Sequence, residues 1–151
     1  MSSWRQQALI EAPVESVWSL LEDPSRFAEW NDAVAVTGAP TRIEKGTELR
    51  LRGRGPFGIP ATTTFRVEEL DEMREIKLRC QRSGFYSHWL LTDARGDTFA
   101  ELEMGVEPVP GIEGKALAAI HTKRFLRTAA ERTLDGLRRV AGQRGETARP
   151  E

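Results

Sequence analysis

Residues 53–58, GRGPFG, match the glycine pattern G-x-G-x-x-G, which holds the pyrophosphate of a dinucleotide in many enzymes. That chemistry needs a strand before the glycines and a helix that begins among them, because free amides at the helix N-terminus bind the phosphate. Residues 47–52 alternate as a strand does, but residues 61–67 are rich in β-branched side chains and are again typical of a strand. The pattern therefore predicts a Gly/Pro connection between two antiparallel strands, and not a nucleotide site.

Two histidines and one cysteine are the other candidates for acid, base or nucleophilic chemistry. His88 and His121 lie far apart in the sequence and have no acidic partner at a ligand-like spacing, so they predict no metal site. Cys80 is the only cysteine, which excludes an internal disulfide and a zinc site built from cysteines. We interpret Cys80 as a small core residue and not as a reactive thiol. No cofactor is expected, and the catalytic residues, if there are any, stay unknown at this point.

The remaining charged side chains form an acidic group and a basic group. The acidic group, on one face of a predicted strand, consists of Glu101, Glu103 and Glu107. Basic neighbours across the strands favour a solvated charge ladder over a catalytic carboxylate pair. The basic group consists of Arg50, Arg52, Arg54 and Arg66. It lacks interleaved aromatic residues on which bases could stack, so no nucleic-acid partner is predicted.

The chain as a whole is typical of one domain. It has 151 residues and a formal net charge of -1, which gives no general attraction to polyanions. No apolar run approaches the roughly 20 residues of a membrane-spanning helix, so no stable membrane insertion is expected. The start, MSSWRQQ, lacks the apolar run of a signal peptide, and we expect a cytoplasmic protein. We predict a domain over residues 1–141 and a flexible tail over residues 142–151, and leave the oligomeric state open.

Periodicity predicts the elements that must position these residues. A strand over residues 4–11 is followed by two short helices, the first with apolar residues at i, i+3, i+4 and i+7 from Val14. Strand and turn signals then continue to Glu107 and indicate six more strands. One long helix is predicted over residues 112–141. This order defines an α+β fold.

Loop lengths predict the register, because residues opposite each other in an antiparallel pair share a sheet face. A two-residue loop at 71–72 pairs Phe65 with Leu78, Val67 with Ile76, and Thr63 with Cys80. Loops at 81–84 and 94–97 give the pairs Cys80–Phe85, Ile76–Trp89, Phe85–Val106, Ser87–Met104, Trp89–Leu102 and Leu91–Ala100. One face is then apolar throughout, while the other is charged and carries His88 between Lys77 and Glu103.

The apolar face must be covered, and the C-terminal helix is the only long apolar element left to cover it. Its inward stripe is predicted to consist of Ala119, Leu126, Ala130, Leu134, Leu137 and Ala141. Lys123 interrupts this stripe, where it either reaches solvent or meets an acidic group of a ligand. His121 is expected beside the stripe, at a partly exposed helix position. The sheet should therefore curl around this helix.

Residues 10–34, IEAPVESVWSLLEDPSRFAEWNDAV, resemble the opening of the START-like, or SRPBCC, helix-grip superfamily, and in particular its polyketide cyclase/dehydratase and lipid-transport branch. The resemblance extends along the chain in the order of elements, including the GDT of residues 96–98 before the last strand. It implies a curved antiparallel sheet of about seven strands wrapped around the long C-terminal helix. Members hold hydrophobic ligands between the two, and some cyclise polyketides there. Residues 53–60 then resemble a loop at the mouth of that cavity.

We therefore predict that a hydrophobic or aromatic small molecule, lipid-like or polyketide-like, binds between the sheet and the C-terminal helix. The predicted ligand-binding residues are Trp30, Leu51, Phe57, Thr63, Phe65, Leu78, Cys80, Ser87, Trp89, Leu102, Met104, Ala119, Lys123 and Leu126. Two alternatives are a cofactor-independent polyketide cyclase or dehydratase and, less favoured, a protein-interaction module of the Hsp90-activator type. An ionisable residue facing the cavity would favour the enzyme. An exposed apolar patch on the outer face would favour the interaction module.

Overall fold

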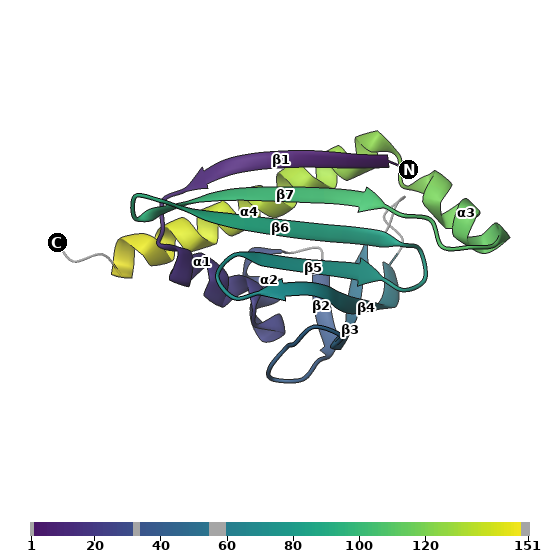
Figure 1. Ribbon diagram of the computed structural model, residues 1–151, viewed down its shortest axis with the longest axis horizontal. Helices are drawn as coiled ribbons and strands as arrows, with labels where there is room; N and C mark the ends of the chain where they lie inside the picture. Colours follow the sequence, from purple (N-terminus) through teal and green to yellow (C-terminus); the bar gives the residue numbers. More distant parts are fainter. Residues whose placement is uncertain (1, 32–33, 55–59, 149–151) are drawn as a thin grey trace.

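The computed structural model describes residues 2–31, 34–54 and 60–148. Its elements are β1 (Ser2–Ile10), α1 (Val14–Leu21), the 3-10 turn η1 (Pro24–Arg26), α2 (Phe27–Trp30), β2 (Val34–Gly38), β3 (Glu48–Arg54), β4 (Pro60–Asp71), β5 (Glu75–Cys80), β6 (Phe85–Ala94), β7 (Asp97–Val106), α3 (Ile112–Ile120) and α4 (Lys123–Ala148). In this part of the chain the strands form one antiparallel sheet in the order β1-β7-β6-β5-β4-β3-β2 (Figure 1). Strand β3 ends at Arg54 and its antiparallel partner β4 begins at Pro60, so the glycine pattern lies between two paired strands as predicted, although residues 55–59 themselves lie outside the described part of the chain.

The two short helices after β1 form as predicted, with a 3-10 turn between them. Helix α1 follows Pro13, the N-cap residue, and buries an apolar stripe. Asp23 follows α1 and caps η1. Its Oδ1 accepts hydrogen bonds from both the backbone N and the Oγ of Ser25, at 3.0 and 2.6 Å. These caps fix α2, and with it Trp30, beside the sheet.

The predicted register of β5, β6 and β7 is confirmed. Ile76 pairs with Trp89 and Leu78 with Ser87, while Phe85, Ser87, Trp89 and Leu91 pair with Val106, Met104, Leu102 and Ala100. His88 lies between Lys77 and Glu103 on the outer face, as predicted, and its Nε2 is 2.6 Å from Oε2 of Glu75. The short loops between these strands fix which residues can pair, and so determine the register.

The predicted register of β4 against β5 is wrong by two residues. Phe65 pairs with Cys80 and Val67 with Leu78, because the pairing shifts between Val67 and Glu69 and the turn spans three residues rather than two. An extra residue in β4 forms a β-bulge at this shift, and Met73 in the turn has a φ of 68°. A slip of two residues keeps each side chain on its face, so Phe65 and Val67 still point inward as predicted.

Helix α4 lies behind the sheet in Figure 1 and packs against β1, β7, α1 and α2. The buried residues of its inward stripe are Leu126, Ala130, Leu134, Leu137 and Ala141. Gly136 stands where α4 crosses α2, and a Cβ there would lie closer than 3.0 Å to the carbonyl oxygen of Trp30. The absence of a side chain at Gly136 therefore allows the helix to pack directly on the backbone of α2.

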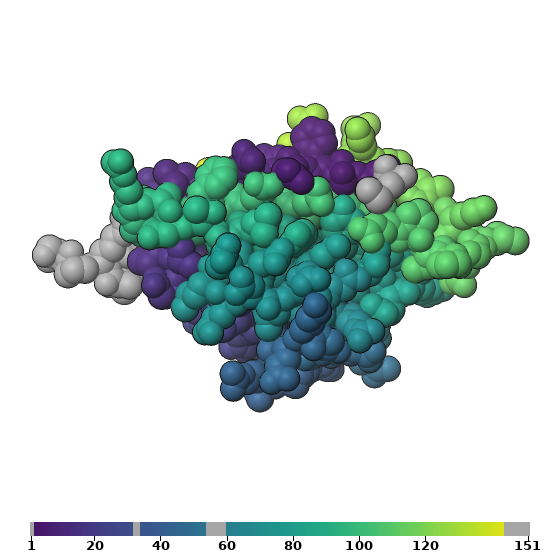
Figure 2. Space-filling model, in the orientation of Figure 1, coloured from purple at the N-terminus to yellow at the C-terminus, as the bar shows by residue number. Residues whose placement is uncertain are grey.

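The single C-terminal helix that we predicted is two helices. The chain breaks at His121, and Thr122 caps α4, with its Oγ1 accepting a hydrogen bond from the backbone N of Phe125 at 3.2 Å. Helix α4 also continues to Ala148, so most of the segment that we expected as a tail from Gly142 is helical. Helix α3 projects at one end of the sheet in the space-filling view (Figure 2).

The outer face of the sheet carries an ion-pair network. Arg5 contacts Glu101 and Glu103 at 3.1 Å, and Glu103 accepts a hydrogen bond from the Tyr86 hydroxyl at 3.0 Å. Tyr86 is 3% exposed because its ring lies over Gly105, where a Cβ would come closer than 3.0 Å to it, and beneath the ammonium group of Lys77. Burial, the hydrogen bond to Glu103 and the charge of Glu103 raise the pKa of Tyr86 to about 12.

Candidate functional site

Four ring side chains line one end of the inner face, where α4 begins. We call them the aromatic rim: Phe65 on β4, Phe85 on β6, His121 at the α3–α4 break and Phe125 in α4. The ring centroids of Phe65 and Phe85 lie 6.3 Å apart, those of Phe85 and His121 5.5 Å, and those of His121 and Phe125 5.4 Å. The three phenylalanines are only partly buried although they stand on the apolar side of the sheet. Aromatic surface left open on the inner face is suited to contact with an apolar ligand.

The sheet beside the aromatic rim is apolar with two small polar side chains. Leu51, Leu78 and Met104 are buried there, while Thr63 and Ser87 are half-buried. Leu51 pairs with Thr63, and Ser87 pairs with both Leu78 and Met104, so these residues share the inner face. Hydroxyl groups at these positions could orient a polar atom of an otherwise apolar molecule.

Trp30 and Trp89 lie deeper and pack together. Their ring centroids are 5.9 Å apart at 90°, and both side chains are buried. The indole nitrogen of Trp30 donates a hydrogen bond to the carbonyl oxygen of Leu20 at 2.9 Å. These contacts hold α2 to the sheet, and both tryptophans belong to the buried core.

Most of the predicted ligand-binding residues lie on the inner side of the sheet. They are Trp30, Leu51, Thr63, Phe65, Leu78, Cys80, Ser87, Trp89, Leu102, Met104 and Leu126. Ala119 and Lys123 do not lie there, because the helix break at His121 turns both into solvent. Our prediction that Ala119 belongs to the inward stripe is therefore wrong, and of the two alternatives left open for Lys123 the structure shows the one in which it reaches solvent. Phe57 lies outside the described residues.

His121 is the residue whose position we predicted least well. It is 8% exposed and stacks on Phe85, whereas we expected a partly exposed helix position. Its Nδ1 lies 2.7 Å from the carbonyl oxygen of Leu117, which requires Nδ1 to carry the proton and donate it. Burial lowers the pKa of His121, against the opposing effect of this hydrogen bond. Near neutral pH the ring is thus uncharged, with Nε2 as an acceptor.

Sequence reasoning left Phe85, His121 and Phe125 out of the site. Phe85 was placed on the inner face by its pairing with Val106, but nothing marked it as more open than its neighbours. Thr122 is the signal that could have located the other two, since threonine is a favoured N-cap residue. A helix that restarts at Lys123 turns Phe125 toward the sheet and leaves His121 in the break.

The outer face presents two further features. A pocket of about 400 Å³ lies around Arg66 and Arg79, on the side of the sheet opposite the aromatic rim. Leu9, Leu90 and Phe99 are 52%, 39% and 38% exposed. Leu9 pairs with Phe99 across β1 and β7, and Leu90 is a diagonal neighbour on β6, so the three form a small apolar patch. Such a patch is the feature that the interaction-module alternative requires.

None of the helices in the described part of the chain has the length and apolarity to cross a bilayer. Within residues 2–31, 34–54 and 60–148, no three histidine, cysteine, aspartate or glutamate side chains cluster as metal ligands would.

A curved antiparallel sheet that holds a long C-terminal helix, with two short helices after its first strand, is the helix-grip fold. The polyketide cyclase/dehydrase and lipid transport family model matches residues 1–142, and the chain belongs to that family. No curated protein matches the chain.

Solved structures share this fold over nearly the whole chain. An AHSA1-like protein from Aeromonas hydrophila is 16% identical, with a TM-score of 0.74 and 99% of each chain covered. Protein NE0264 from Nitrosomonas europaea is 12% identical, with a TM-score of 0.69, and 94% of this chain and 95% of that one are covered. Protein Ms6760 from Mycobacterium smegmatis is 14% identical, with a TM-score of 0.63 and coverages of 96% and 92%. These similarities support the fold, and the ligand must be inferred from the site.

Proposed function

We propose that the protein binds a hydrophobic or aromatic small molecule, lipid-like or polyketide-like, against the aromatic rim on the inner face. The observation that carries this proposal is the partial exposure of Phe65, Phe85 and Phe125 on the side of the sheet that otherwise forms the core. Burying these rings under a ligand would remove apolar surface from water, which is the main source of affinity for such molecules. The family to which the chain belongs supports the same function.

Affinity is expected in the micromolar range. A ligand of about 25 non-hydrogen atoms at about 0.3 kcal/mol per atom gains roughly 7.5 kcal/mol, equivalent to a dissociation constant of a few micromolar. Since the inner face presents phenyl rings, hydroxyl groups and a neutral His121, affinity should change little with pH above neutrality.

Binding of a fluorescent aromatic probe, displaced by a long-chain fatty acid, tests the proposal. Phe85→Ala should weaken probe binding roughly 2- to 10-fold, because a ring contact contributes about 0.5–1.5 kcal/mol. Ser87→Phe should abolish binding by filling the inner face. Phe99→Ala is the matched control, since Phe99 is a partly exposed phenylalanine on the outer face. Equal loss with Phe85→Ala and Phe99→Ala, in variants shown by circular dichroism to be folded, would contradict the proposal.

The alternative function, a cofactor-independent cyclase or dehydratase, is favoured by one observation. His121 is an ionisable residue in the aromatic rim, and its Nε2 has no hydrogen-bond partner among the described residues. An uncharged imidazole with a free acceptor can take a proton from a bound substrate. An aromatic polyketide-like compound should then be converted at a rate that rises with one ionisation below neutral pH and is lost in His121→Asn. Binding without any conversion, or conversion at a rate that His121→Asn leaves unchanged, would exclude His121 as the base.

A further inference from the structure

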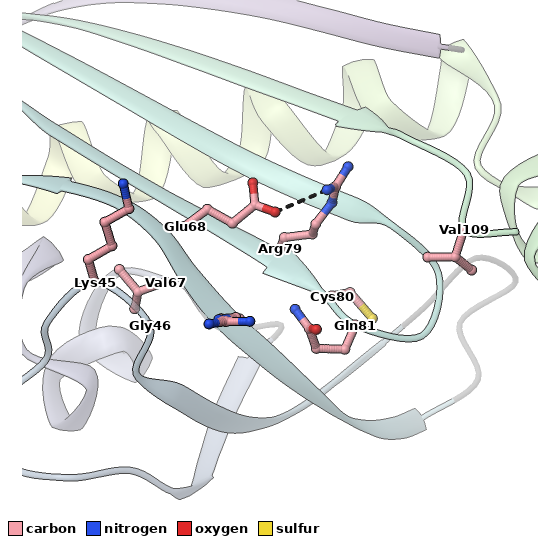
Figure 3. Close-up of a pocket in the computed structure, with 9 residues that line it drawn as sticks. Lys45, Gly46, Val67, Glu68, Arg79, Cys80, Gln81 and Val109 are labelled. Carbon is pink, nitrogen blue, oxygen red and sulfur yellow. Dashed lines mark hydrogen bonds and ion pairs between the residues drawn. The ribbon is translucent and has the colours of Figure 1, made fainter.

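The pocket on the outer face has a different chemistry from the inner face. The residues that define its character are Lys45, Arg66, Glu68, Arg79, Gln81 and Val109. Arg66 and Arg79 alternate along their strands with the buried residues Val67 and Cys80, so their side chains project from the face opposite α4. Figure 3 shows the side chains of Glu68 and Arg79 in front of the strands, with α4 behind the sheet. A molecule held here would not touch the aromatic rim.

The β-bulge in β4 places the carboxylate of Glu68 at this pocket. The pairing of β4 with β5 shifts between Val67 and Glu69, which turns Glu68 and Glu69 toward the same face. Glu68 contacts Arg79 at 3.0 Å and Lys77 at 3.4 Å, and Glu69 contacts Lys45 at 3.5 Å. Glu107 forms further ion pairs with Arg79 and with Lys77. The charges of these basic residues are therefore compensated within the protein.

Arg66 is left without compensation. Its cross-strand neighbour on β5 is Arg79, a like charge, and its neighbour on β3 is Glu48, with which it forms no ion pair. Among the residues that the structure describes, no hydrogen bond or salt bridge engages the guanidinium group of Arg66. Like charges opposite each other in a sheet are unfavourable unless an anion separates them. The guanidinium group of Arg66 is therefore able to donate to an acceptor from outside the chain.

The other donors of the pocket surround that group. Gln81 is exposed next to Cys80, and its side-chain amide is not engaged by any described residue. The Lys45–Glu69 pair is well exposed and therefore weak, so the Lys45 ammonium group can turn to a stronger acceptor. Val109 adds a half-buried apolar surface to the wall. Two cations, an amide and an apolar wall are suited to a small organic anion with a short apolar part.

We propose that this outer pocket is a second binding site, in which Arg66 and Gln81 hold the carboxylate or phosphate group of a small organic anion. The guanidinium group of Arg66 donates two parallel hydrogen bonds to the anion, Gln81 donates a third, and Val109 contacts the apolar part of the molecule. Because the net charge of the chain is -1, attraction is local to the pocket and does not arise from a general positive field.

Titrations followed by NMR, with the amide and arginine side-chain resonances of the intact chain as readout, test this site. Acetate, butyrate and inorganic phosphate are added separately at constant ionic strength. The expected result is a saturable shift at Arg66 and Gln81, and Arg66→Gln should weaken the bound anion roughly 10- to 100-fold, as expected for loss of charge-assisted hydrogen bonds. Tighter binding of butyrate than of phosphate assigns the site to carboxylates, and the reverse order assigns it to phosphates.

Arg52→Gln is the matched control. Arg52 is an exposed arginine on β3 that projects from the same face, and it does not line the pocket. Its substitution removes the same charge and should change affinity by less than about threefold, since exposed charges act weakly through water. Glu48→Gln should tighten anion binding, because it removes the carboxylate that pairs with Arg66 across β3 and β4. Equal weakening by Arg52→Gln and Arg66→Gln, or no saturable shift with any of the three anions, would overturn the proposal.

Discussion

Substitution of Gly136 tests how α4 is held in the fold. A Cβ at this position would come closer than 3.0 Å to the carbonyl oxygen of Trp30, and it would lie 3.3 Å from the carbonyl carbon. Both are backbone atoms, so no change of side-chain rotamer can relieve the contact. In Gly136→Ala, α4 must move away from α2 or α2 must shift against the sheet.

The size of the effect follows from two opposing terms. Alanine is more favourable than glycine in a helix by about 1 kcal/mol, whereas forcing extra atoms into a packed interface costs about 1–3 kcal/mol. Because the new Cβ meets backbone atoms that cannot turn away, its cost lies near the upper end of this range, at about 3 kcal/mol. After the gain of about 1 kcal/mol from alanine, Gly136→Ala should lower the free energy of unfolding by about 2 kcal/mol. Gly142 lies in the same helix, and a Cβ added there would meet nothing within 4 Å. Gly142→Ala should therefore raise the free energy of unfolding by roughly 0.5–1 kcal/mol.

Urea unfolding followed by tryptophan fluorescence and by circular dichroism measures both variants. The predicted difference between them is about 3 kcal/mol, which corresponds to a shift of the urea midpoint of about 1–3 M at the usual slopes for small proteins. A Gly136→Ala protein as stable as Gly142→Ala would refute the packing of α4 on the carbonyl group of Trp30.

Three further predictions concern individual side chains. Burial lowers the pKa of His121, so on acidification the imidazole takes up a proton in the unfolded chain before it does so in the folded one. The free energy of unfolding should therefore fall as pH falls below the ordinary histidine pKa of 6.5. In urea unfolding, His121→Phe should lose less stability than the native protein between neutral and mildly acidic pH. Tyr86 is the only tyrosine, so tyrosinate absorbance should titrate near pH 12 in the folded protein and near 10.0 in denaturant, and a native titration near 10.0 would contradict its burial. Gly105→Ala should displace the Tyr86 ring, which breaks its hydrogen bond to Glu103 and returns the tyrosine pKa toward 10.0 in the same titration.

The helix-grip topology could be predicted from the sequence because its signals are local. Loops 81–84 and 95–96 leave little choice of register for β5, β6 and β7, and the outward position of His88 followed directly. The register of β4 could not be predicted, because nothing in the residues near Glu68 marks an extra residue in the strand. The turn that compensates for it places Met73 at a positive φ, where glycine or asparagine is the usual choice.

The candidate site was predicted less completely than the fold, and for a specific physical reason. An apolar periodicity continues across His121, so the sequence from residue 112 onward is compatible with one helix. Tertiary contacts and the Thr122 cap decide in favour of a break, which turns Lys123 outward and stacks His121 on Phe85. The openness of Phe65, Phe85 and Phe125 depends on where α4 begins over the sheet. Distant packing, and not local pattern, therefore determines which inner residues remain accessible.

The central claim is that the ligand lies on the inner face, and intermolecular NMR contacts test it most directly. Leucine methyl groups serve as reporters on both sides of the sheet, with Leu78 and Leu126 on the inner side and Leu9 and Leu90 on the outer face. With an isotope-labelled protein and an unlabelled fatty acid or aromatic polyketide-like compound at saturation, we predict nuclear Overhauser contacts from the ligand to the methyl groups of Leu78 and Leu126. Contacts confined to Leu9 and Leu90 would contradict the account.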